Sequence, residues 1–128
     1  MKYGLQKKLY EKYPIIFSQK DLPMMETAMC WGIECGDGWF SIIDSLCSEI
    51  QGSCNDGRAP QVQAVQVKEK YGSLRFYLDR HIECFENYID MAEAISKRVC
   101  EQCGSFTQIE DELIGYGSAR DYCENCNK

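Results

Sequence analysis

Residues 61–79 read QVQAVQVKEKYGSLRFYLD, and this stretch decides the fold that the sequence predicts. β-Branched residues with partial alternation fill residues 61–70, and alternation returns in residues 73–79, which is typical of two strands. Only Tyr71-Gly72 separates the two runs, so they are predicted to form an antiparallel hairpin. A lone hairpin is marginally stable in water, so it must pack against helices.

A long helix is predicted on each side of this hairpin. Asp37 is the expected N-cap of the first, because an aspartate side chain accepts hydrogen bonds from free helix N–H groups. Gly52 is its expected end. The second helix covers about residues 82–99, where no proline or glycine interrupts the apolar stripe.

A shorter amphipathic helix is predicted at residues 3–13, where Leu5, Leu9 and Tyr13 recur at helical spacing before Pro14. The segment between this helix and the next is expected to be mostly irregular. The predicted fold class is therefore α+β, with helices packed on a small antiparallel sheet.

The cysteines carry the clearest chemical pattern in the chain. There are nine in 128 residues, and four of them form two C-x2-C pairs, Cys100 with Cys103 and Cys123 with Cys126. The 19 residues between the pairs match the spacing of a four-cysteine zinc ribbon, in which four thiolates surround one ion. Four thiolates leave no open coordination position, so the predicted Zn²⁺ is structural.

The same pattern predicts the division of the chain. Residues 1–99 are expected to form the α+β body and residues 100–128 a zinc ribbon attached to its last helix. The ribbon segment is too short and polar to build a core of its own, so the metal would supply its stability. Reduced or redox-active thiols, and iron in a rubredoxin-like site, remain alternatives. The other cysteines are expected to pack as small apolar residues or stay free thiols: Cys30, Cys35, Cys47, Cys54 and Cys84.

The charge distribution limits the classes of partner. The formal net charge is −6, and only residues 1–20 carry a basic excess. Nucleic-acid binders usually show a basic stripe, so nucleic acid is the less favoured partner. The chain has no apolar run long enough to span a membrane, and its start lacks the apolar region of a secretory signal. We therefore expect a cytoplasmic protein with reduced thiols and no membrane partner.

Three segments carry a resemblance to a known family. They are Ile33–Phe40 (IECGDGWF), Val67–Tyr77 (VKEKYGSLRFY) and Cys100–Gly104 (CEQCG). Together they resemble a family of small uncharacterised proteins of bacteriophages and prophages, over roughly residues 30–126. Members of that family often end the second metal pair with Cys and His, whereas this chain has Cys126 there. The resemblance implies a phage-like, cytoplasmic context and no established enzyme chemistry.

A partner-binding surface is a further hypothesis, because Trp, Tyr and Arg are the residues that most often anchor protein interfaces. The candidate residues are Asp37, Trp39, Lys68, Lys70, Tyr71 and Arg75. The alternative is that Asp37 caps a helix, Trp39 fills the core and the hairpin is scaffold.

The function expected from these features is that of a non-enzymatic, zinc-containing accessory protein that binds another protein. The partner would be a host protein, for example a defence factor that the chain inhibits or redirects. Catalysis is disfavoured, because the sequence has one histidine, His81, and no phosphate-binding loop motif. A nucleic-acid-binding zinc ribbon is the alternative.

Overall fold

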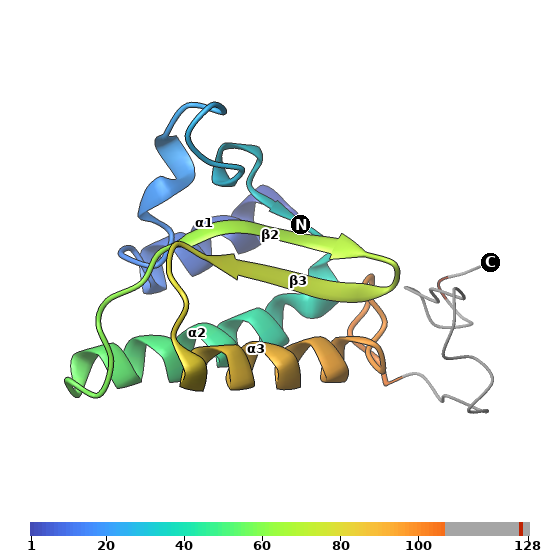
Figure 1. Ribbon diagram of the computed structural model, residues 1–128. Coiled ribbons are helices and arrows are strands. Elements are labelled where there is room, and N and C mark those ends of the chain that lie inside the picture. The colour runs from blue at the N-terminus through green and yellow to red at the C-terminus, as the bar shows by residue number, and fades with distance from the viewer. Residues whose placement is uncertain (107–125, 127–128) are drawn as a thin grey trace.

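The computed structural model describes residues 1–106 and 126, and the described residues form an α+β fold (Figure 1). Its helices are α1 (Tyr3–Lys12), α2 (Phe40–Asn55) and α3 (Glu83–Ser96). Its strands are β1 (Ile33–Glu34), β2 (Ala64–Lys70) and β3 (Ser73–Leu78). Short 3₁₀ turns shape the segment between α1 and α2: Ser18–Asp21, Met29–Trp31 and Asp37–Trp39. The α+β prediction is confirmed.

The hairpin forms as predicted, because β2 and β3 pair antiparallel across a two-residue turn. Tyr71 and Gly72 both have positive φ, 53° and 81°, as a type I′ turn requires. The expectation of a purely antiparallel sheet is wrong, since β1 adds a third strand parallel to β2. Ile33 pairs with Val67 in that ladder. Two residues are too few to show an alternating pattern, so β1 could not be predicted from the residues alone.

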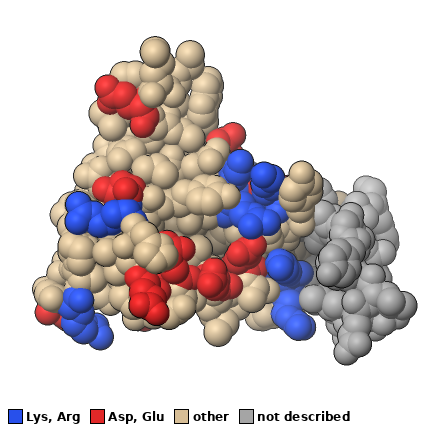
Figure 2. Space-filling model, viewed as in Figure 1, with Lys and Arg blue, Asp and Glu red and all other residues tan. Residues whose placement is uncertain are grey.

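The two faces of the sheet have different surroundings. Val67 and Phe76 are paired across the hairpin and are buried in the core with Leu74. Lys68 and Arg75, the next pair, lie on the opposite face, which is open to the viewer in Figures 1 and 2. The helices cover the buried face, and Figure 1 shows α2 and α3 running beneath the hairpin. The core between these layers contains the largest fully buried side chains, among them Trp39, Phe17 and Phe85.

Helix α3 is joined to the sheet through a buried serine. The Leu74 N–H donates to Ser96 Oγ at 2.8 Å, and the Ser96 hydroxyl donates to the Glu93 carbonyl at 2.6 Å. Glu93 also forms an ion pair with Arg75 at 2.9 Å. The last turns of α3 therefore satisfy polar groups of β3 that would otherwise lack a partner.

Helix α2 starts and ends later than predicted. Asp37 begins a 3₁₀ turn rather than capping α2, and its carboxylate instead accepts the Lys2 N–H at 2.7 Å, at the start of α1. At the other end the helix continues through Gly52 to Asn55. It stops where Gly57 adopts φ 74° and the Arg58 N–H donates to the Ser53 carbonyl at 3.0 Å. This is a Schellman ending, so the left-handed glycine, not the first glycine, ends the helix.

In the part of the chain that the structure describes, none of the helices has the length and apolar character needed to cross a membrane.

The serine that joins α3 to β3 gives a first test. We expect Ser96→Ala to lower the free energy of unfolding by about 1–3 kcal/mol, because it leaves the buried Leu74 N–H unsatisfied. Urea denaturation followed by circular dichroism measures the change. Ser48→Ala is the matched control, since Ser48 is an exposed serine of α2 and its loss should change stability by less than about 0.5 kcal/mol. Equal stability of both variants would show that the Ser96 hydrogen bonds do not hold α3 in place.

Candidate metal centre

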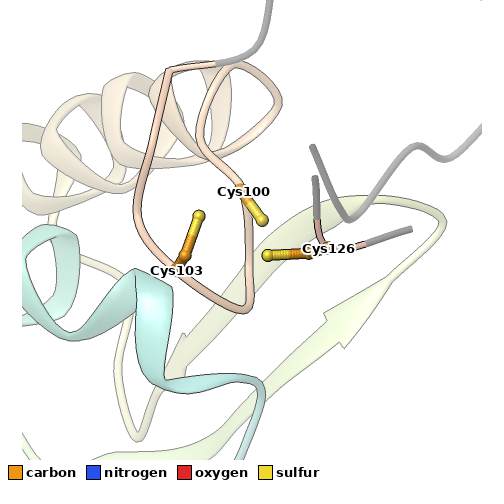
Figure 3. A group of neighbouring side chains, drawn as sticks. All are labelled: Cys100, Cys103 and Cys126. Atoms are coloured by element: carbon orange, nitrogen blue, oxygen red, sulfur yellow. The ribbon is translucent and has the colours of Figure 1, made fainter. Parts of the chain in front are cut away.

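Residues 99–106 fold into a tight loop directly after α3, which we call the cysteine knuckle. Val99 and Phe106 form an antiparallel bridge, and the Cys100 N–H donates to the Ser105 carbonyl at 2.7 Å. Inside the loop, the Gly104 N–H donates to the Cys100 carbonyl at 2.9 Å. Gly104 has φ 81°, a left-handed conformation that glycine adopts without strain. The turn brings the Cys100 and Cys103 side chains near each other (Figure 3).

The structure brings three of the four predicted ligands together. The sulfur atoms of Cys100, Cys103 and Cys126 all lie within 4.8 Å of one another, and Figure 3 shows the three side chains converging. A tetrahedral ion with Zn–S bonds of about 2.3 Å holds its sulfurs about 3.8 Å apart, so the spacing is close to that of a metal site. Cys123 lies outside the described residues. The three cysteines form a cluster that could hold a metal ion.

The surroundings of the cluster differ from one sulfur to the next. Cys100 is buried, Cys103 is exposed and Cys126 is intermediate. The Ser105 hydroxyl lies 3.0 Å from Cys103 Sγ, where it can donate to the sulfur once this is a thiolate. The side of the knuckle that carries the cysteine sulfurs is thus partly exposed to solvent, while its other side is packed against the rest of the protein.

The knuckle packs into a cradle formed by Gly36-Asp37-Gly38-Trp39, which we call the glycine cradle. The Gly38 N–H donates to the Glu101 carbonyl at 2.6 Å, and the Gly36 N–H donates to Glu101 Oε1 at 2.7 Å. The Trp39 indole N–H donates to the Val99 carbonyl at 2.9 Å. Residues 99–101 are therefore bonded to the body, so contacts cross the boundary predicted after residue 99. The rest of the predicted ribbon, residues 107–125 and 127–128, lies outside the described residues.

At both Gly36 and Gly38 of the cradle, the knuckle lies too close for a side chain to fit. A Cβ at Gly38 would lie 2.5 Å from Gly104 N and closer still to the Cys100 carbonyl oxygen. A Cβ at Gly36 would lie 2.8 Å from Glu101 Cγ and closer still to the Glu101 carbonyl oxygen. Any other residue would push the knuckle away. Sequence reasoning missed this role, although two glycines around one residue before a tryptophan are a signal of close backbone approach.

The proposed partner surface does not hold together as one patch. Trp39 is fully buried, so it cannot contact a partner, and the alternative that it fills the core is the correct one. Asp37 lies in the glycine cradle, where it bonds to Lys2 through the backbone N–H and lies 3.8 Å from Lys2 Nζ. These two residues therefore belong to the docking of the knuckle and of α1.

The four hairpin residues of that hypothesis do share a region, which we call the hairpin face: Lys68, Lys70, Tyr71 and Arg75. Tyr71 is 77% exposed at the turn, and Lys70 Nζ lies 5.5 Å from the centre of its ring. Figure 2 shows basic side chains gathered near this end of the hairpin, with a row of acidic side chains over α3 below them. Arg75 forms an ion pair with Glu93 of α3 at 2.9 Å.

Most of the remaining cysteines are packed among other residues. Burial raises the pKa of the Cys35 thiol to about 12, and burial also raises the pKa of Cys47 far above its usual value. Both thiols are therefore protonated at neutral pH and poor nucleophiles. Cys30 and Cys54 donate to the carbonyls of Thr27 and Pro60, each at 3.4 Å. The five cysteines outside the cluster are free thiols: Cys30, Cys35, Cys47, Cys54 and Cys84.

Comparison with known proteins finds no matching family model, no matching curated protein and no matching solved structure. The resemblance to the phage family stays a prediction, and the site is interpreted from its own geometry.

The cradle gives a test with a control in the same protein. We expect Gly38→Ala to weaken metal binding by at least about tenfold and to lower the melting temperature, because the added methyl group displaces the knuckle that carries Cys100 and Cys103. Competition against a chromogenic chelator measures the affinity. Gly52→Ala is the matched control. Gly52 lies in α2 with nothing near its Cβ position, so this change should stabilise the protein by about 0.5–1 kcal/mol without affecting the metal. An unchanged affinity in Gly38→Ala would mean that the cradle does not position the ligands.

Proposed function

We propose that the cysteine cluster binds one structural Zn²⁺ and that Cys123 is the fourth ligand. The proposal is supported by the convergence of three sulfurs in one cluster and by the C-x2-C spacing of the remaining pair. Thiolates are soft ligands that suit zinc, and a full set of four leaves no position for substrate. The ion would hold residues 123–126 against the knuckle. The hydrogen bonds of the glycine cradle would hold the knuckle in place before the ion binds.

The function that these features support best is binding of another protein by a non-enzymatic accessory protein. The observation that carries it is the exposed Tyr71 at the tip of the hairpin face, with Lys70 Nζ 5.5 Å from the centre of its ring. Among the described residues, neither Lys68 nor Lys70 has an acidic partner within ion-pair distance. An exposed aromatic ring beside unpaired cations is the kind of group that anchors a protein interface.

The biological setting of this proposal rests on the resemblance and on the free thiols. A phage-type protein would act in the host cytoplasm, and a host factor, such as a defence protein, would be its partner. The five cysteines outside the cluster are free thiols, which is typical of a reducing compartment. The absence of catalysis is part of the same proposal. His81, the one histidine, is exposed and lies 3.7 Å from the Glu86 carboxylate, and the buried thiols of Cys35 and Cys47 are protonated.

Nucleic-acid binding is the second candidate, and the hairpin face is also what favours it. Lysines and a tyrosine on an open sheet can contact phosphates and stack on bases. The acidic row over α3 lies beside the hairpin face and would repel a nucleic-acid backbone (Figure 2). A protein partner with an acidic region therefore fits the surface better.

Metal content is tested by native mass spectrometry with elemental analysis of the full chain. We expect one zinc per chain, and loss of that zinc in Cys103→Ser, with a lower melting temperature for the C-terminal part. Cys84→Ser is the control, because Cys84 is an exposed cysteine on α3 outside the cluster. A metal-free protein, or zinc retained at full affinity in Cys103→Ser, would contradict the proposed site. Iron in place of zinc would contradict the assigned metal but not the ligands.

The hairpin face is tested by Tyr71→Asn, which removes the ring and keeps a residue that tolerates positive φ. We expect this variant to capture a saturable partner from bacterial lysate at least about tenfold less well than the native chain. Tyr3→Asn is the matched control, since Tyr3 is a similarly exposed tyrosine on α1. Equal capture by all three proteins would exclude the hairpin face. A steep, salt-dependent shift of labelled DNA or RNA, lost in Tyr71→Asn, would favour the second candidate.

A further inference from the structure

An apolar groove of about 580 Å³ runs along α2 and α3 and ends at the cysteine knuckle. It is distinct from the hairpin face. Its large apolar side chains come from three elements: Ile42 and Leu46 on α2, Tyr88, Met91 and Ile95 on α3, and Phe106 on the knuckle.

The rim of this groove is exposed to solvent. Met91 is 63% exposed and Phe106 is 81% exposed. Single exposed apolar side chains are common, but a set of them around one groove marks an interaction site. Small-molecule sites enclose most of their ligand, which an open groove between two helices does not do. The shape therefore fits a polypeptide segment laid along the two helices.

The charged side chains that line the groove indicate the charge of the partner that it binds. Among the described residues, the charged side chains that line it are Asp37 and Glu49, and no described lysine or arginine lines it. Asp37 is partly offset by Lys2, 3.8 Å away, whereas Glu49 has no ion-pair partner among the described residues. The whole of α2 contains acidic residues and no basic one. Lys97 and Arg98 follow α3 in the chain but do not line the groove.

We propose that the groove binds an amphipathic helix of a partner protein, with the apolar side of that helix in the groove and a lysine or arginine facing Glu49. Residues at i, i+3, i+4 and i+7 of such a helix can fill an apolar groove between two helices. A second copy of this chain is a poorer occupant, because it would bring a second acidic α2 wall against the first. The inference rests on the proposed protein-binding function but uses a different surface.

The test uses the full chain and three labelled synthetic peptides of about 18 residues, roughly one helical turn longer than the 14 residues of α3. The first has leucines at the four anchor spacings and lysines elsewhere, the second replaces its lysines with glutamates, and the third scrambles the first. We expect saturable binding of the first peptide, and at least about tenfold weaker binding of the other two, by fluorescence anisotropy. Amide NMR signals of α2 and α3 residues that line the groove should shift with the first peptide.

Variants locate the binding. Met91→Asp should weaken the first peptide at least about tenfold, and Glu49→Lys should weaken it while strengthening the glutamate peptide. The matched controls are Met25→Asp, at a methionine that is 92% exposed away from the groove, and Asp90→Lys, at an exposed acid of α3 that does not line it. Both should bind as the native chain does.

Several results would overturn the inference. They are equal binding of the lysine peptide and its scrambled form, unchanged binding in Met91→Asp, or a dimer that Met91→Asp dissociates, which would make a second copy the occupant. Tyr71→Asn should bind the peptide normally. A negative result for binding at the groove can therefore be distinguished from a negative result for binding at the hairpin face.

Discussion

The hydrogen bonds between the glycine cradle and the cysteine knuckle join parts of the chain that are 60 to 65 residues apart. Trp39 lies at the start of α2 and bonds to Val99, just after α3, so one buried indole connects the two helices to the metal loop. Asp37, between the two glycines, bonds to the start of α1. Because three helices meet at these four residues, Cys100 is placed by the core and not by the metal alone. A half-formed site would lower the conformational ordering that binding of the proposed zinc has to impose.

Because the knuckle is bonded to the body, the proposed metal would affect more than the ribbon. In a separate ribbon, zinc would stabilise only the residues between its ligands. Here the knuckle is also a wall of the groove, since Cys103, Gly104 and Phe106 line its end. An ion that fixes the knuckle therefore also shapes a surface on which a partner can bind, without touching that partner. The proposed set of four thiolates would leave no open coordination position, which agrees with such an indirect role.

The predictable parts of this structure were those with a local signal. Two-residue alternation on either side of Tyr71-Gly72 gave the hairpin, the uninterrupted apolar stripe gave α3, and the C-x2-C spacing gave the cluster. The parts that were missed depend on tertiary contacts. Strand β1 is two residues long, and Asp37 uses its carboxylate on α1 rather than on its own helix. Gly36 has an ordinary φ of −76°, so only the approach of Glu101 explains why no side chain fits there.

The charges of the two proposed surfaces have opposite sign, which constrains any partner. The hairpin face is basic and aromatic, while the groove is apolar and the charged side chains that line it, as far as the structure describes the chain, are acidic. One helix of a partner cannot complement both, because the lysine that suits Glu49 is repelled by Lys68 and Lys70. If both surfaces bind, they bind different segments, either two regions of one large partner or two partners held together. Under the proposed function, the second arrangement would let the chain bring a host factor to another molecule without changing that factor chemically.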